Sequence, residues 1–262
     1  WPNFAFGGST STYSEGKYRT IIDATSYAYR NYLFDSISSY DNSGWGTSLS
    51  APTVSAAAID IVDWYSTTYG NMIKDPGVLF STLLLMGDGQ GRTYVLSQGF
   101  DPLWGSGRLR TRIFTPSGMD SPYGWSINWL CIANGQVISL HPNNGNKLSS
   151  DVDSFRAVAF WYDSRHQTGQ QIDNIDMKLW QEGTTRVELG NSHSLYDNKE
   201  RIYLHSIGGR TLTLEIIGTR VTSTEFSANC GSGNRMKVYF AYFFEDSDRD
   251  DIDGPDETIS PE

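Results

Sequence analysis

Residues 44–58 read GWGTSLSAPTVSAAA, and Ser48 stands there among small residues, directly before a run with helical spacing. Pro52 suits the first turn of a helix, where its missing N–H leaves no bond unmade. The apolar residues that follow predict a buried helix ending near Gly70; they are Val54, Ala57, Ala58, Ile61, Val62 and Tyr65. Ser48 is therefore either a nucleophile at a helix N-terminus or a polar residue that caps the helix.

A serine in this position has the surroundings that a nucleophile needs. The small neighbours allow a sharp backbone turn and let a substrate carbonyl approach closely. The free N–H groups and the dipole of the following helix point to the same place. Ser48 can then present its Oγ to an acyl carbon, while its own N–H binds the developing oxyanion.

The complete string favours the nucleophile. Residues 46–56, GTSLSAPTVSA, resemble the nucleophile motif of subtilisin-like serine proteases (peptidase S8), G-T-S-x-[SA]-x-P-x-x-[STAVC]-[AG], and satisfy every constrained position. Residues 4–27, 75–86 and 104–109 resemble, more loosely, the strand–loop–strand, late helix and closing turn of that family. Two departures are Asp23-Ala24-Thr25, where the family usually has Ala-Pro-Gly, and Thr53, where it often has histidine.

The resemblance implies that residues 1–115 are the C-terminal part of a three-layer α/β catalytic domain with Ser48 as nucleophile. It also implies protein or peptide substrates, a secreted or cell-surface location and no required cofactor. In the family, the catalytic aspartate and histidine precede the serine. Only 47 residues precede Ser48 and none is histidine, so we expect a fragment that is inactive alone. Asn3, the early amide considered for the oxyanion hole, falls in a predicted strand and is not assigned that role.

Two other functions remain open from the residues. A catalytically inactive relative would act as a binding or scaffold module. An unrelated hydrolase with the order Ser…Asp…His would use one of the four histidines, all of which follow Ser48: His141, His166, His193 and His205. Ser50 stands where the nucleophile elbow of such hydrolases has its second glycine, which argues against this alternative.

The second half of the chain has the period of strands. A Pro- and Gly-containing linker at 116–124 precedes a domain predicted at 125–245. Seven strands are predicted within 135–142, 153–164, 175–182, 184–190, 201–207, 210–221 and 235–246. Short strands at this spacing indicate an all-β antiparallel sandwich or jelly roll. This half resembles the β-sandwich module that follows the catalytic domain in many larger subtilases.

Charge and composition exclude several kinds of partner. The formal net charge is −10, and residues 246–262 alone carry eight acidic and one basic side chain. The rest of the chain is near neutral and lacks the basic stripe of a nucleic-acid-binding protein. No apolar run has the length of a membrane span. The tail at 246–262 is expected to be disordered, although its alternating acids resemble a degenerate calcium loop.

Two further expectations concern a metal and a disulfide. Asp163, Asp173, Asn174 and Asp176 are candidate oxygen ligands for a structural calcium ion, with metal-free loop carboxylates as the commoner alternative. The two cysteines exclude a thiolate zinc cluster. They lie near opposite ends of the strand-rich half, so one disulfide across that domain and two buried thiols are both consistent with the sequence.

Overall fold

The protein is described from a computed structural model. The structure describes residues 33–36, 39–41, 47–69, 75–87, 100, 106, 109, 126–163, 173–194, 197–222, 230–231 and 234–246. The first elements are a short antiparallel hairpin, β1 (Leu33–Ser36) with β2 (Ser39–Asp41), and the helices α1 (Thr47–Tyr69) and α2 (Pro76–Leu85). Eight further strands follow.

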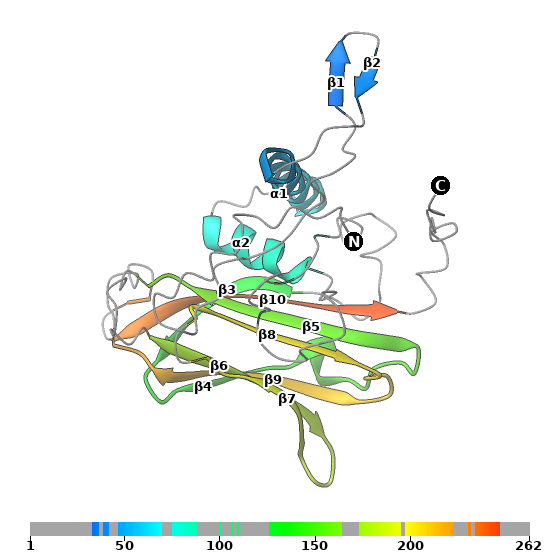
Figure 1. Ribbon diagram of the computed structural model, residues 1–262. Coiled ribbons are helices and arrows are strands. Elements are labelled where there is room, and N and C mark those ends of the chain that lie inside the picture. The colour runs from blue at the N-terminus through cyan, green and yellow to red at the C-terminus, as the bar shows by residue number, and fades with distance from the viewer. Residues whose placement is uncertain are drawn as a thin grey trace.

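The eight strands form two four-stranded antiparallel sheets (Figure 1). The helix-facing sheet has the order β3-β10-β5-β8, and the outer sheet has the order β4-β9-β6-β7. The bounds are β3 Ser126–Ala133, β4 Val137–Leu140, β5 Val152–Trp161, β6 Asn174–Glu182, β7 Val187–Ser192, β8 Lys199–His205, β9 Thr211–Arg220 and β10 Arg235–Asp246. Because consecutive strands mostly alternate between the sheets, this is the arrangement of a jelly roll.

Strand alternation sorts the side chains of the helix-facing sheet into two cores. On β5, Phe155, Ala157 and Trp161 point into the sandwich, while Val158 and Phe160 point toward the helices. The sandwich core is closed by the apolar faces of the outer sheet. The second core joins this sheet to both helices, so the sheet is buried on both faces, in keeping with the apolar run at 157–161 in β5.

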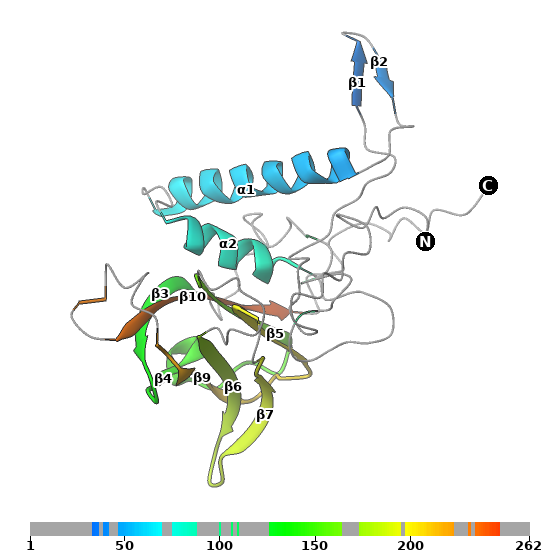
Figure 2. The ribbon, with the colours of Figure 1, turned by 60° about the vertical axis from the view of Figure 1, so that its left-hand side comes forward.

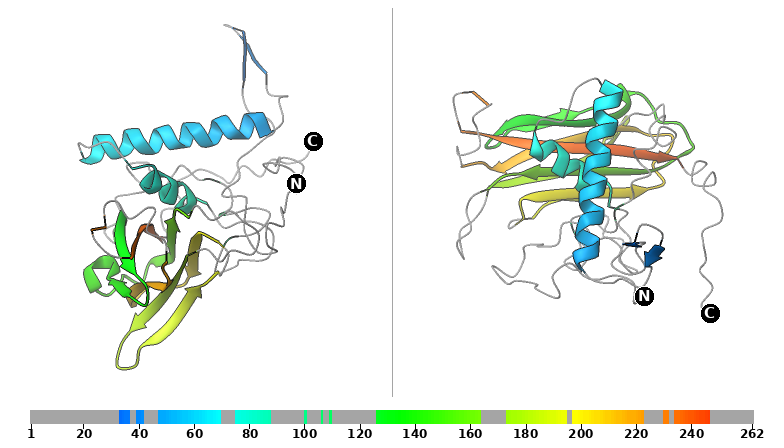
Figure 3. Two further views of the ribbon diagram at one scale, coloured as in Figure 1. Left: turned by 90° about the vertical axis from the view of Figure 1, so that its left-hand side faces the viewer. Right: turned by 90° about the horizontal axis from the view of Figure 1, so that it is seen from above.

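The helices cover the sheet as successive layers. Figure 2 shows α2 lying on the helix-facing sheet and α1 lying on α2, away from the strands. In Figure 3, seen from above, α1 crosses the strands steeply and its N-terminal end projects beyond the sandwich. Of the described α1 side chains, Ala57 and Ile61 are buried, whereas Ile59 is 68% exposed.

The prediction of a three-layer α/β fold is wrong. The described residues contain antiparallel pairings and no parallel sheet between helix layers. The expected burial of the helix after Ser48 is also wrong, because α1 packs along one side only. The apolar residues at helical spacing form one stripe of α1, where Ala57 and Ile61 are buried, while polar residues such as Asp60 and Asp63 are exposed.

The sandwich half agrees with the sequence prediction. The seven predicted strands are present, and β3 is an eighth, edge strand that directly follows the predicted linker. The linker at 116–124 and the tail after Asp246 lie outside the described residues, so their boundaries stay predictions.

Of the two alternatives for the cysteines, a disulfide or two buried thiols, the structure shows the disulfide. Cys131 on β3 and Cys230 before β10 form a disulfide with a sequence separation of 99 residues. A closed loop of this size constrains the unfolded chain, by about 4–5 kcal/mol in the chain-entropy account. The disulfide therefore links the edge strand β3 covalently to the segment that precedes β10.

Candidate functional site

Ser48 is the second residue of α1. Its N–H is among the first-turn groups that have no acceptor within the helix. Pro52 lies inside the helix and has no N–H, so it cannot donate the usual bond to the carbonyl of Ser48 four residues earlier. At the predicted nucleophile, the start of α1 thus has an N–H without a helical acceptor and a carbonyl that lacks its usual helical donor. The surroundings of the Ser48 side chain lie outside the description.

One side of α1 faces away from α2, and its described side chains are exposed. Ile59 is exposed, and Pro52, Ser55 and Asp63 on the same side are exposed as well. We call this the open side of α1, defined by Pro52, Ser55, Ile59 and Asp63.

The N-terminal end of α2 is anchored to the sheet by an ion pair. Asp75 caps the helix by accepting from the N–H of Gly77 at 3.1 Å, and its carboxylate also pairs with Lys237 on β10. Burial alone would raise the pKa of Asp75, but the bonds from Lys237 and Gly77 hold it below its ordinary value. Gly77 itself sits against the Tyr239 ring, which an added Cβ would meet at 2.3 Å.

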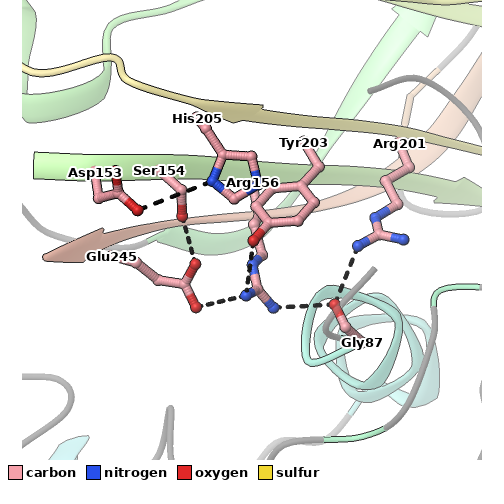
Figure 4. A network of polar contacts seen from close by, with 8 residues as sticks. All are labelled: Gly87, Asp153, Ser154, Arg156, Arg201, Tyr203, His205 and Glu245. Carbon is pink, nitrogen blue, oxygen red and sulfur yellow. Dashed lines mark hydrogen bonds and ion pairs between the residues drawn. The ribbon is translucent and has the colours of Figure 1, made fainter. Parts of the chain in front are cut away.

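The C-terminal end of α2 is held by two buried arginines (Figure 4). The carbonyl of Gly87 accepts from Arg156 Nη1 at 3.0 Å and from Arg201 Nη2 at 3.1 Å. Arg201 Nη1 also donates to the carbonyl of Ser106 at 2.8 Å. Cations at this end and a carboxylate at the other match the helix dipole, so charge fixes the position and direction of α2 on the sheet.

Arg156 joins this anchor to a polar cluster at the end of the sheet. It pairs with Glu245 on β10 and contacts the hydroxyl of Tyr203 on β8 at 3.4 Å, while Ser154 donates to Glu245. Figure 4 shows these side chains converging from three neighbouring strands. Sequence analysis did not identify this group, because cross-strand pairing of distant segments brings it together and no local pattern encodes it.

The described histidines belong to the sandwich. His141 contacts Thr213 on the outer sheet, and His193 contacts Asn191 beside β7. His205, the last residue of β8, has its Nδ1 at 3.9 Å from Asp153 Oδ2, with both side chains about half exposed. This is the one histidine–carboxylate ion pair among the residues that the structure describes. His166 and Asn3 lie outside them.

The four candidate calcium ligands form hydrogen bonds within the fold, but Asn174 Oδ1 is buried without a hydrogen-bonding partner among the described residues. Asp163 accepts from the N–H of Asp173, and Asp173 in turn accepts from Thr222. Asn174 donates to Asp176 at 3.0 Å. Within the described parts of the chain, no cluster of three or more histidine, cysteine or acidic side chains is arranged to hold a metal ion. The calcium site stays a prediction.

No helix in the described segments is both long enough and apolar enough to cross a bilayer.

Comparison with known proteins assigns no family. The sequence matches no protein-family model, and no curated protein matches it. Among solved structures, a mitogen from Yersinia pseudotuberculosis matches with a TM-score of 0.29 and 10% identity, over 51% of this chain and 92% of the mitogen. A protein from Sulfurospirillum deleyianum matches with a TM-score of 0.28 and 8% identity, over 44% of this chain and 97% of its own. Similarities at this level carry no functional argument.

Proposed function

We propose that this chain supplies the nucleophile of a serine endopeptidase of the subtilisin type, with Ser48 forming the acyl-enzyme. The carrying observation is the position of Ser48 in the first turn of α1, within the motif at 46–56. The proposal rests on the chemistry of this helix start and is independent of the three-layer fold, which the structure overturned.

The proposed reaction uses Ser48, a histidine and the carboxylate that orients this histidine. Ser48 Oγ attacks the peptide carbonyl carbon and passes its proton to a histidine, and that histidine then protonates the leaving amine. The Ser48 N–H, free of a helical acceptor, donates to the oxyanion. Water afterwards hydrolyses the acyl-enzyme. The histidine and its orienting carboxylate are proposed to approach the first turn of α1.

The setting of the proposed enzyme follows from the same resemblance. Its substrates are proteins or peptides, and it works outside the cell or at the cell surface. The Cys131–Cys230 disulfide supports this location, because such bonds persist in oxidising compartments. The proposed mechanism uses no metal or organic cofactor.

Labelling with a fluorophosphonate probe tests the proposal. The chain, expressed together with any residues that its gene encodes upstream of Trp1, should be labelled at Ser48 and should cleave peptides. Ser48→Ala should abolish both, while Ser50→Ala, a matched change in the same helical turn, should leave labelling in place. The 262-residue chain alone should be unlabelled. A folded full-length product that is not labelled would overturn the proposal and favour an inactive binding module.

A second candidate is favoured by one observation, the His205–Asp153 pair. It would serve a hydrolase with the order Ser48…Asp153…His205. Ser50 stands where the nucleophile elbow of such hydrolases has its second glycine, which argues against this function. Labelling of Ser48 in the 262-residue chain that is lost in His205→Ala would establish it and overturn the subtilisin-type proposal.

A further inference from the structure

The sequence contains two Asn-Gly pairs, Asn134–Gly135 and Asn144–Gly145, and both lie in exposed turns of the sandwich. Asn-Gly is the dipeptide in which a main-chain nitrogen reaches the preceding side-chain amide with least hindrance, because glycine has no Cβ. The two pairs share this chemistry but differ in how the fold holds them.

The first pair is held by two hydrogen bonds. Asn134 Oδ1 accepts from the N–H of Val221 at 3.0 Å, which fixes the side-chain amide against the end of β9. The N–H of Gly135 donates to the carbonyl of Gly218 at 2.7 Å, so the nitrogen that would attack is directed to the neighbouring strand. Both bonds must open before Asn134 can react.

The second pair has no such restraint on its side chain. Asn144 is exposed, and its amide has no hydrogen-bonding partner in the described parts of the chain. Asn143, Asn144 and Gly145 have φ values of 53°, 54° and 76° in succession. This left-handed region is unfavourable for L-residues, although asparagine tolerates it better than most. The N–H of Asn146 closes this turn by donating to the carbonyl of Asn143 at 2.9 Å, but that bond restrains neither the side-chain amide of Asn144 nor the N–H of Gly145.

We propose that Asn144 is a site of spontaneous deamidation and that Asn134 is protected by the fold. The main-chain nitrogen of Gly145 attacks Cγ of Asn144; a C–N bond forms, and ammonia leaves, taking up the proton of the attacking nitrogen. Water then opens the cyclic imide at either carbonyl and yields aspartate or isoaspartate at position 144. Each event adds one negative charge beside the outer sheet, and isoaspartate also lengthens the main chain of the turn.

The test compares the two asparagines within one molecule. The folded 262-residue chain is incubated at mildly alkaline pH, and deamidation and isoaspartate at each position are measured by peptide mapping with mass spectrometry. Because two bonds must open first at Asn134, Asn144 should react about tenfold faster or more. In denaturant, where neither turn persists, the two rates should become similar.

Two variants test which asparagine produces the added negative charge. Asn144→Gln should suppress the acidic species that accumulate on isoelectric focusing, and Asn134→Gln should leave them unchanged. Equal rates in the folded chain, or an intact Asn144 under conditions that deamidate it in the unfolded chain, would overturn the proposal.

Discussion

Glu200 on β8 turns its carboxyl into the sandwich, where it is 1% exposed. It contacts the hydroxyl of Ser192 and accepts from the N–H of Ser194 at 2.6 Å. Burial, together with the negative charges of Asp176 and Asp197, raises its pKa from 4.5 to about 8, although both bonds oppose the rise. The folded protein therefore carries a protonated carboxyl at neutral pH.

This carboxyl makes the stability of the sandwich depend on pH. An unfolded Glu200 loses its proton near pH 4.5, whereas the folded one keeps it until about pH 8. Its stabilising contribution is complete below the unfolded pKa and is lost as the pH rises through the folded pKa. In that window the free energy of unfolding should fall by at most about 1.4 kcal/mol per pH unit from this group.

We expect Glu200→Gln to flatten the fall in stability between these pH values, because glutamine keeps the shape without the titration. Urea unfolding at a series of pH values measures the effect. Glu188→Gln is the control, since the hydrogen bond from Asn191 lowers the pKa of that carboxyl and it stays ionised throughout the window. An unchanged slope in Glu200→Gln would contradict the assignment.

At the scale of elements, α2 connects the sandwich to α1 and is seated by close contact as well as by charge. At Gly77 the helix lies directly against the Tyr239 ring of β10, since a Cβ added there would meet the ring at 2.3 Å. Tyr239 also hydrogen-bonds to Asp75 and has a raised pKa, chiefly through burial. The ring therefore has little freedom to move aside.

Gly77→Ala should lower the free energy of unfolding by about 1–3 kcal/mol, the usual cost of forcing extra volume into a packed site. Gly183→Ala is the matched control, since its nearest neighbour would lie at an ordinary 3.6 Å. Thermal and urea denaturation measure both. Equal stability of the two variants would show that α2 is not seated on Tyr239.

The same elements show what local sequence can predict. Asp75-Pro76 signals the start of α2, and the structure places the cap and first turn there, because capping is decided by neighbouring residues. The strands could be predicted from the alternation of apolar and polar residues along the sequence. β3 carries Asn128 and Trp129 exposed at a sheet edge, so its apolar pattern is weak and sequence analysis missed it.

The residues of the candidate site also differ in whether the sequence could predict them. Ser48 could be singled out because its motif is continuous in sequence. The arginines on Gly87 could not, since Arg156 and Arg201 meet that carbonyl only when β5 and β8 pair. The burial of α1 was mispredicted because an apolar composition indicates that a helix is covered, but not which surface covers it.

At the scale of the whole molecule, the layers differ in how firmly they are held. Each sheet is hydrogen-bonded throughout, and the disulfide adds a covalent link. α1 is the outermost layer, and Ala57 and Ile61 are its buried contribution to the core shared with α2. Segments with little buried apolar contact open at lower free energy than the rest of a protein. The helix carrying Ser48 is therefore expected to be the least protected of the long elements.

Hydrogen exchange should show this order, with amides of α1 exchanging about tenfold faster or more than those of β5 and β10. Ile61→Ala removes a fully buried side chain, and truncations of this kind cost about 2–5 kcal/mol. It should accelerate exchange in α1 while leaving the sandwich strands unchanged. Ile59→Ala, two residues away on the open side, should change neither. If Ile61→Ala accelerated exchange equally in β5 and β10, α1 and the sandwich would open as one cooperative unit, contrary to the layered order argued from the contacts.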